Sequence, residues 1–462
     1  MRARHRIRTV LFVALLLVVA ASAGGAIAPP AEAGMITPGG PAWWYEFKGV
    51  SLVYDAWLAG VRLPDGSLAA VGTSENDYSS TGDILVGRFN AQGRGIWMKV
   101  WDGPDHRRDY ATAIATDRSG SVIVAGTCTS TANAKDIVVV KWAKSGALLW
   151  SAVYDGPTHA DDEAQDVAVD TRGNVLVCGY AGGENGQGVV VKLDGATGSE
   201  AWARLVQTEA GGWSALRALE IDGDGNVYVA GSRAGTASPS DVFVRKYSTG
   251  GRTRWTRSVD GVDHLHDGAF ALDLAPGPAL YVAGALQTVT RGQDALLLKY
   301  TLGGRLSWQR TWDGGVNGRD TFQAVACDAR GNAFVAGVSD SGGIVGDRGL
   351  LVRYTTGGKR SWARTFFNEA SSSYVRYVGL VVSGAGNAWA GGTTDAGGSV
   401  GAALLTRYNA NGTQQWARAW TGPKGNSAVL HDLVAGGGGL FVSGSFAAGP
   451  GDQDAWAGVF MK

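Results

Sequence analysis

Eight tryptophans recur through this chain at nearly constant spacing, each of them four residues after a glycine. Consecutive members of the series are 52 to 54 residues apart. The tryptophans are Trp44, Trp97, Trp150, Trp202, Trp255, Trp308, Trp362 and Trp416. A period near 53 that continues over more than 370 residues predicts one structural unit repeated eight times, rather than a series of unrelated domains.

The second repeat shows the plan of the unit. It divides into four short apolar or alternating runs, 110–117, 122–126, 136–142 and 148–154, separated by turn residues such as Arg-Ser-Gly and Lys-Ser-Gly. Such runs are typical of antiparallel strands. A single four-stranded sheet cannot bury both of its faces, but sheets stacked radially can. The sequence therefore predicts an all-β fold, an eight-bladed β-propeller with four-stranded blades.

Two turns of the repeat carry recognisable chemistry. An Asp opens and a Gly closes the first hairpin, because the Asp accepts backbone N–H bonds and the Gly takes a positive φ. The third hairpin carries the Gly-x-x-x-Trp, and we expect each indole to lie against the neighbouring blade. The alternative is an aromatic platform for sugars. The first hairpins are 117–120, 170–173, 222–225 and 328–331.

The last repeat predicts how the ring closes. It contains three strands, at 427–435, 440–445 and 454–460, and its fourth strand is missing. The first Gly-x-x-x-Trp, Gly40 to Trp44, has no strands before it. A strand at about 43–50 is therefore expected to complete the last blade (427–462), which removes open sheet edges. Residues 34–462 would form a single domain.

Residues 1–33 are typical of a secretory signal peptide. Four arginines precede an apolar run from Val10 to Ala21, and Ala31-Glu32-Ala33 offers a small-x-small cleavage site before Gly34. The expected location is outside the cell or in the cell envelope, with no membrane span after cleavage. An uncleaved anchor is the alternative, because apolar character continues loosely to Ala28.

Charge and cysteine usage exclude some functions. Without residues 1–33 the chain has 37 basic and 40 acidic residues, which gives no electrostatic footprint for nucleic acid. Three irregularly spaced cysteines do not make a disulfide scaffold. Cys178 is expected to be a small buried hydrophobe, and a Cys128–Cys178 bridge between neighbouring blades is the alternative.

The repeat resembles two groups of propellers. Asp194-Gly-Ala-Thr197-Gly198-Ser-Glu-Ala-Trp202 resembles the docking motif of quinoprotein-type eight-bladed propellers, Asp-x-x-Thr-Gly-x-x-x-Trp. The stretch from Asp170 to Gly179 is similar to bacterial SBBP-type repeats. Together the resemblance covers about residues 40–462 and implies the fold more than a function. Quinone-dependent alcohol dehydrogenases of that family carry adjacent cysteines beside the cofactor, and this chain has no adjacent pair.

A recurring loop after the outer strand is the best candidate for binding. It reads Asp-Gly-x-x-(His/Asn)-x-x-Asp in four blades, and a fifth blade has an Asp at the last position. We expect these aspartates where each inner strand begins, near one mouth of the central channel. The loop aspartates are Asp55, Asp109, Asp162, Asp267 and Asp320, and the loop histidines are His106, His159 and His264.

Two interpretations of this loop stay open. The structural one is that Asp-Gly makes the turn and the last Asp accepts backbone N–H bonds. The functional one is a ring of carboxylates, with the histidines nearby, that binds a polar ligand or a hard cation such as Ca²⁺. The aspartates at 136, 241, 294 and 454 recur ten residues after a glycine, and we interpret them as structural starts of the third strand.

No catalytic motif stands out in the sequence, and no catalytic or cofactor-binding residue is predicted. The expected function is that of a secreted, monomeric binding or scaffold module for a protein or a glycan. The alternative is a propeller-class enzyme, a lyase, hydrolase or degenerate quinoprotein, with its site at the channel mouth. That alternative predicts that polar side chains which break the repeat gather in one cleft.

Overall fold

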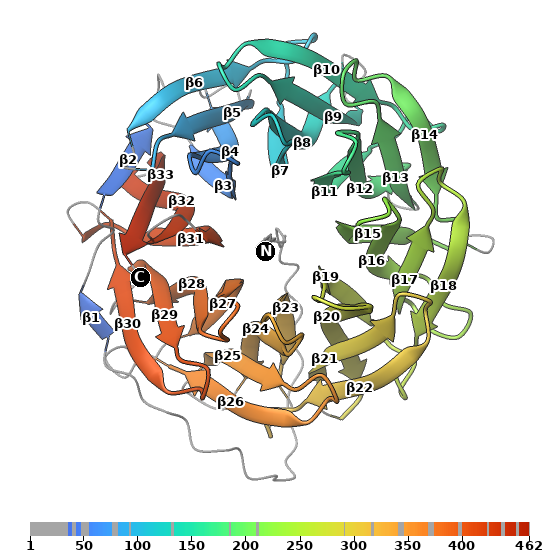
Figure 1. Ribbon diagram of the computed structural model, residues 1–462, viewed down its shortest axis with the longest axis vertical. Helices are drawn as coiled ribbons and strands as arrows, with labels where there is room; N and C mark the ends of the chain where they lie inside the picture. The colour runs from blue at the N-terminus through green and yellow to red at the C-terminus, as the bar shows by residue number, and fades with distance from the viewer. Residues whose placement is uncertain are drawn as a thin grey trace.

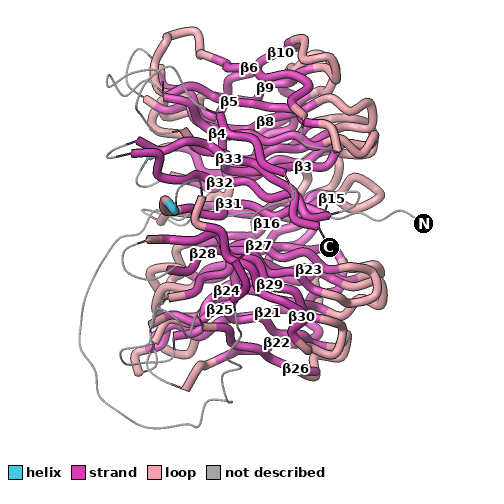
Figure 2. The backbone as a smooth tube through the Cα atoms, turned by 90° about the vertical axis from the view of Figure 1, so that its left-hand side faces the viewer, coloured by secondary structure: helices cyan, strands magenta, loops and turns pink. Residues whose placement is uncertain are grey.

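The computed structural model shows eight β-sheets arranged as blades around a central axis (Figure 1). It describes residues 55–75, 82–91, 94–130, 134–183, 186–208, 212–290, 292–315, 318–340, 346–367, 374–395, 400–422, 425–435, 439–449 and 452–461, and the backbone of 36–38 and 43–47. The proposed signal peptide lies outside these ranges. Figure 2 shows strands stacked through the molecule and loops on both faces. Within the described part of the chain, no helix is long and apolar enough to cross a bilayer.

Blades 1 to 4 each consist of four consecutive antiparallel strands. Blade 1 contains β3 (Ala56–Arg62), β4 (Leu68–Glu75), β5 (Gly82–Phe89) and β6 (Gly95–Trp101). Blade 2 contains β7 (Tyr110–Thr116), β8 (Val122–Thr129), β9 (Lys135–Trp142) and β10 (Leu148–Tyr154). Blade 3 contains β11 (Glu163–Val169), β12 (Val175–Ala181), β13 (Gln187–Leu193) and β14 (Glu200–Leu205). Blade 4 contains β15 (Ser214–Ile221), β16 (Val227–Arg233), β17 (Asp241–Tyr247) and β18 (Thr253–Val259).

Blades 5 to 8 repeat the pattern. Blade 5 contains β19 (Gly268–Leu274), β20 (Ala279–Thr288), β21 (Gly292–Thr301) and β22 (Leu306–Trp312). Blade 6 contains β23 (Thr321–Cys327), β24 (Ala333–Asp340), β25 (Asp347–Tyr354) and β26 (Arg360–Phe366). Blade 7 contains β27 (Val375–Val382), β28 (Ala388–Asp395), β29 (Gly401–Tyr408) and β30 (Gln414–Trp420). Blade 8 contains β31 (Ala428–Ala435), β32 (Gly439–Gly449), β33 (Asp452–Met461) and, from the other end of the chain, β2 (Trp43–Phe47).

The N-terminal segment closes the ring, as the repeat count predicts. Strand β2 pairs antiparallel with β33, and Trp44 lies opposite Gly458. One pairing is not predicted by the sequence. A three-residue strand, β1 (Ile36–Pro38), adds to the outer edge of blade 7 and runs parallel to β30. The outer edges of two neighbouring blades are therefore covered by the same short stretch of chain.

The hydrophobic core lies between blades rather than within them. Val139 of blade 2 and Val177 of blade 3 belong to one buried cluster, and each is at most 3% exposed. This division follows from the geometry, because each blade presents one apolar face to each neighbour. Cys178 is fully buried in the next such cluster, as predicted. All three cysteines are free thiols, so the alternative of a Cys128–Cys178 bridge is not realised.

The recurring tryptophans link neighbouring blades at the outer strands, as expected. The indole N–H of Trp150 donates to the carbonyl of Gly195 in blade 3 at 3.2 Å, and Lys141 Nζ donates to the same carbonyl at 2.6 Å. Equivalent indole bonds of 3.0–3.2 Å join five more pairs of blades. The donors of those bonds are Trp97, Trp202, Trp255, Trp308 and Trp362.

Candidate functional sites

The aspartates of the recurring loop cap their own turns. Asp162 is fully buried, and its two carboxylate oxygens accept bonds from the backbone N–H groups of Gly156 and of Gly182, the latter at 2.8 Å. The matching aspartates of three other blades accept a bond from the Asp-Gly glycine at 2.5–2.8 Å and are 0–2% exposed. They are Asp109, Asp267 and Asp320. Asp55 is also buried, at 1% exposed.

The loop histidines hold an unusual backbone conformation. His106, His159 and His264 have φ values of 50°, 52° and 54°, in the left-handed region that non-glycine residues rarely occupy. Each ring Nδ1 lies 2.6 Å from the carboxylate of the Asp that opens the loop. That hydrogen bond, together with the charge of the Asp, raises the pKa of each histidine. These contacts give the histidines a role in shaping the loop.

The loop aspartates are not among the residues that line the cavity of the central channel. The channel contains a cavity of about 1020 Å³, lined by inner strands and by the turns that follow them. Strand β7 lines this cavity from Thr112 to its last residue, Thr116, and Asp117 in the following turn lines it too. Asp109 precedes the strand and is not among the lining residues. The structure places the predicted carboxylates between blades. Cation binding by a single ring of carboxylates around the axis stays a prediction.

The aspartates instead meet other carboxylates in groups of three. At the interface of blades 2 and 3, carboxylate oxygens of Asp136, Asp155 and Asp162 lie within 4.8 Å of one another. Asp83, Asp102 and Asp109 form the same group between blades 1 and 2. The sequence pattern indicates only a structural strand start at Asp136, so it misses this grouping. The grouping could have been predicted only from the position of β9 beside the loop that follows β10.

Burial dominates the titration of these carboxylates. It raises the pKa of Asp136 to about 6, and the neighbouring charges of Asp155 and Asp162 act in the same direction. Burial also raises the pKa of Asp109 to about 6, against hydrogen bonds from Gly103 and Thr129 that lower it. Like charges placed so close together repel, so a bound cation would offset the electrostatic repulsion between these carboxylates in the folded chain.

Several acidic residues that line the channel cavity are neutralised by lysines of the same blade. Lys141 Nζ lies 3.0 Å from the Asp117 carboxylate, and Lys192 Nζ lies 2.9 Å from that of Asp170. The repetition of this ion pair marks it as part of the blade. The lysines also donate to the next blade, which links the inner turns to the outer tryptophans.

Side chains that break the repeat occupy one position on the inner strands. In each blade the pairing of the first two strands shifts by one residue, which leaves a bulge. The bulge residues are Leu58, Thr112, Gln165, Arg217, Phe270, Gln323, Val378 and His431. Arg217 and Phe270 of neighbouring blades touch, with the guanidinium 5.8 Å from the ring centre. The varied residues thus encircle the axis instead of gathering in one cleft.

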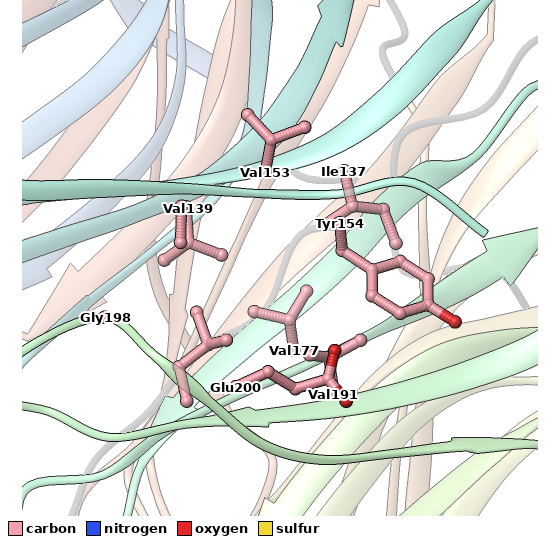
Figure 3. Close-up of a pocket in the computed structure, with 10 residues that line it drawn as sticks. Ile137, Val139, Val153, Tyr154, Val177, Val191, Gly198 and Glu200 are labelled. Carbon is pink, nitrogen blue, oxygen red and sulfur yellow. The ribbon is translucent and has the colours of Figure 1, made fainter.

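A second cavity lies between blades 2 and 3 and is shown in Figure 3. Its volume is about 50 Å³, and the residues that line it include four valines, Ile137, Tyr154 and Glu200. A cavity of this size has room for about one or two small molecules the size of water. We interpret it as a packing gap between two blades.

The rim of the ring carries the clearest departure from symmetry. Five half-exposed aliphatic side chains lie on the outer strands of blades 1 and 2, which are neighbours in the ring (Figure 1). We call them the apolar rim; they are Ile96, Val100, Leu148, Leu149 and Val153, between 48% and 54% exposed. The two positions that Ile96 and Val100 occupy carry Arg254 and Ser258 in blade 4, and Ser307 and Thr311 in blade 5.

The comparisons with solved structures identify the fold. The quinohemoprotein alcohol dehydrogenase of Comamonas testosteroni is 12% identical, with a TM-score of 0.56 over 92% of this chain and 77% of that one. A europium-containing methanol dehydrogenase is 13% identical, with a TM-score of 0.53 over 88% and 84%. Sqt1 of Saccharomyces cerevisiae is 10% identical, with a TM-score of 0.55 over 88% and 97%.

These likenesses support a quinoprotein-like, eight-bladed propeller and leave the activity open. Sequence identities of 10–13% support a shared fold and nothing about a shared activity. The sequence matches no family model and no curated protein. Two of the three neighbours are dehydrogenases by name, whereas the third, Sqt1, is not.

The cysteines do not fit the quinone site that the resemblance implies. That site has two adjacent cysteines beside the cofactor. Here Cys128, Cys178 and Cys327 lie on β8, β12 and β23 of three different blades, and all are free. Burial raises the pKa of the Cys128 thiol to about 12, which leaves it unreactive at neutral pH.

Proposed function

We propose that this chain is an exported, non-catalytic propeller that binds an extended strand of a protein partner along the apolar rim of blades 1 and 2. The observation that supports this most is β10. Its sequence, Leu-Leu-Trp-Ser-Ala-Val-Tyr, contains no charged residue, and it is the outermost strand of its sheet. An outermost strand offers unpaired backbone groups to any strand that approaches it.

Other blades protect the same edge with charge. The outer strands β14, β18, β22 and β26 each carry at least one arginine. Arg204 of β14, for example, donates to the Gly251 carbonyl at 3.0 Å and lies over the Trp202 ring. The position that Arg204 holds is Ala152 in β10. Charged edge strands resist pairing with other chains, so blade 2 lacks a protection that its neighbours have.

The chain itself shows that the outer edge of a blade accepts a strand, even where that edge carries an arginine, Arg418 of β30. Strand β1 pairs with β30 at the outer edge of blade 7, residue by residue from Ile36 opposite Ala417 to Pro38 opposite Ala419. Strand addition supplies affinity through main-chain bonds and specificity through the side chains beside them. At the rim of blades 1 and 2, most of the exposed side chains are aliphatic, with Lys99 of β6 and Ser151 of β10 between them. The proposal therefore favours a partner strand with alternating apolar residues over a glycan.

Export is supported by the composition of residues 1–33. A basic start, an apolar run and the Ala31-Glu32-Ala33 site together make a secretory signal. Partner binding by the rim would then take place outside the cytoplasm. N-terminal sequencing of protein recovered from the producing cells tests this: Gly34 should be the first residue, and a chain that still starts at Met1 would contradict it.

Photo-crosslinking from the rim tests the proposed binding. A benzophenone amino acid replaces exposed Ser151 in the middle of β10, and the matched control replaces Gln309, which holds the same position in β22. We expect one discrete crosslinked product from position 151 and none from 309. The product should disappear when Ile96 and Leu149 are changed to serine. A product that is unaffected by those two changes, or is equally strong from position 309, would contradict the proposal.

Self-association is a separate outcome of the same experiment. A crosslink between two copies of this chain, with a doubled mass in light scattering, would mean that the rim pairs with itself. That result would replace the protein partner by a second copy and would contradict the expected monomer. It would leave the identification of the rim as a binding edge intact.

A further inference from the structure

We propose that Asp136, Asp155 and Asp162 form a binding site for a divalent cation of the Ca²⁺ class at the interface of blades 2 and 3. The three carboxylates come from three segments: β9, the loop after β10, and the residue before β11. The inference stands apart from the proposed function, because it concerns an acidic cluster and not the apolar rim.

The spacing of the three carboxylates suits one ion. Their oxygens lie within 4.8 Å of one another. Oxygens bound to the same Ca²⁺ at ordinary distances lie at most about 5 Å apart. Waters can complete the shell, since the Asp155 side chain is 44% exposed to solvent.

The carboxylate of Asp136 is buried and has no hydrogen-bond donor among the described residues, as expected for a group that binds a cation. Asp136 is 8% exposed, its carboxylate faces the other two, and no described residue donates a hydrogen bond or a salt bridge to it. Lys135 on the same strand is engaged by Glu163 at 2.7 Å, and His159 acts on Asp136 through its charge, which lowers the pKa of Asp136. A buried carboxylate without a donor is costly, so a partner for Asp136 is expected.

The same loop in blade 4 provides an internal comparison. Asp241, Asp260 and Asp267 hold the positions of Asp136, Asp155 and Asp162, each 105 residues further along the chain. Asp241 begins β17 and accepts a hydrogen bond from the hydroxyl of Ser238. Although all three are described, these aspartates do not form a group with the 4.8 Å spacing. The close grouping therefore belongs to particular blades and is not a general consequence of the repeat.

The other two carboxylates keep capacity for a metal. Asp155 accepts a hydrogen bond from His159 on one oxygen. Asp162 accepts backbone N–H bonds on both oxygens, from Gly156 and Gly182. A carboxylate oxygen has two lone pairs and can accept a hydrogen bond and bind a cation at once. The N–H bonds fix the direction of the Asp162 carboxylate, as second partners do for metal ligands.

Calorimetry and thermal unfolding with Ca²⁺ test the site. The whole secreted chain is stripped with a chelator and titrated with CaCl₂, with MgCl₂ in parallel. We expect heat of binding with CaCl₂ and a rise in melting temperature of roughly 2 °C or more at saturation. In Asp136→Asn, a change that keeps the shape, the stoichiometry should fall by one site and the thermal shift should become smaller than that of the parent chain.

The controls keep the result unambiguous. Asp241→Asn, at the matched position of blade 4, should leave the stoichiometry and the shift unchanged. Without cation, Asp136→Asn should melt no lower than the parent chain, because it removes repulsion. The proposal is overturned if neither CaCl₂ nor MgCl₂ gives heat or a shift, or if Asp136→Asn binds with undiminished stoichiometry. Neither outcome affects the rim crosslink, so the two proposals fail separately.

Discussion

Gly198 of blade 3 lies on the indole ring of Trp150 of blade 2, so closely that a Cβ atom on Gly198 would be 2.8 Å from the ring. The glycine has a φ of 76°. The Gly-x-x-x-Trp repeat thus serves two interfaces: its glycine receives the tryptophan of the blade before, and its own tryptophan lies under the glycine of the blade after. Five more pairs share this contact, with 2.6–2.9 Å to the ring: Gly146–Trp97, Gly251–Trp202, Gly304–Trp255, Gly358–Trp308 and Gly412–Trp362.

Replacing Gly198 by alanine should therefore destabilise the ring. The new methyl group would clash with Trp150 and would also hold an unfavourable positive φ, and we expect a loss of about 2–4 kcal/mol. Gly173→Ala is the matched control, since Gly173 has a φ of 92° but nothing within 4 Å of its added Cβ. It should cost about 1–2 kcal/mol, the backbone strain alone. Urea unfolding of both variants measures the difference, and equal losses would contradict the packing argument.

His431 should make the protein sensitive to acid. It occupies the bulge of β31, its Nε2 lies 3.1 Å from the hydroxyl of Ser445, and burial lowers its pKa from 6.5 to about 4. With this lowered pKa, His431 stays neutral in the folded chain down to about pH 4, whereas in the unfolded chain it takes up a proton below about pH 6.5. Stability is then present above pH 6.5 and is lost as the pH falls towards 4.

His431→Gln removes this titration and keeps a polar side chain of similar length. We expect the melting temperature of the variant to fall less between about pH 7.5 and pH 5 than that of the parent chain. Thermal unfolding by circular dichroism at the two pH values provides the comparison. An identical fall in both proteins would mean that His431 does not contribute to acid sensitivity.

The N-terminal strands should be required for stability. Removing residues 34–50 deletes both β1 and β2, leaves β33 without its outer neighbour and opens the ring. We expect the melting temperature to fall by roughly 10 °C or more relative to a chain starting at Gly34. Removing only residues 34–39 deletes β1 and should have a much smaller effect. If the longer deletion melts like the parent, strand β2 does not close the ring.

The repeat made most of the fold predictable from the sequence. The spacing of Trp97 and its equivalents implied the number of blades, and the turn residues between Tyr110 and Tyr154 indicated the four strands of a blade. Strand β1 could not be foreseen, because three residues ending in Pro38 carry no strand signal and their pairing depends on β30, far away in the chain. Local sequence does not encode such a distant pairing.

The candidate sites were only partly predictable. The recurrence of Asp162 and its equivalents located the loop, and the bond from Gly156 agrees with the structural interpretation. The grouping with Asp136 was missed because it depends on which strand lies beside the loop, and the repeat pattern indicates only a strand start there. The apolar rim was missed because Leu149 and Val153 look like core residues in an alternating strand.

The affinity of the chain for the protein captured from position 151 measures how much the apolar rim contributes to binding. The binding constant is measured by interferometry for the parent chain, for the Ile96→Ser, Leu149→Ser double variant, and for Ser307→Thr, a conservative change at the matched position of blade 5. The two serines should weaken binding by about tenfold or more, because two half-exposed aliphatic contacts are lost. They should change stability little, and Ser307→Thr should change neither property. Equal affinity of all three proteins would mean that the apolar rim does not bind the captured protein.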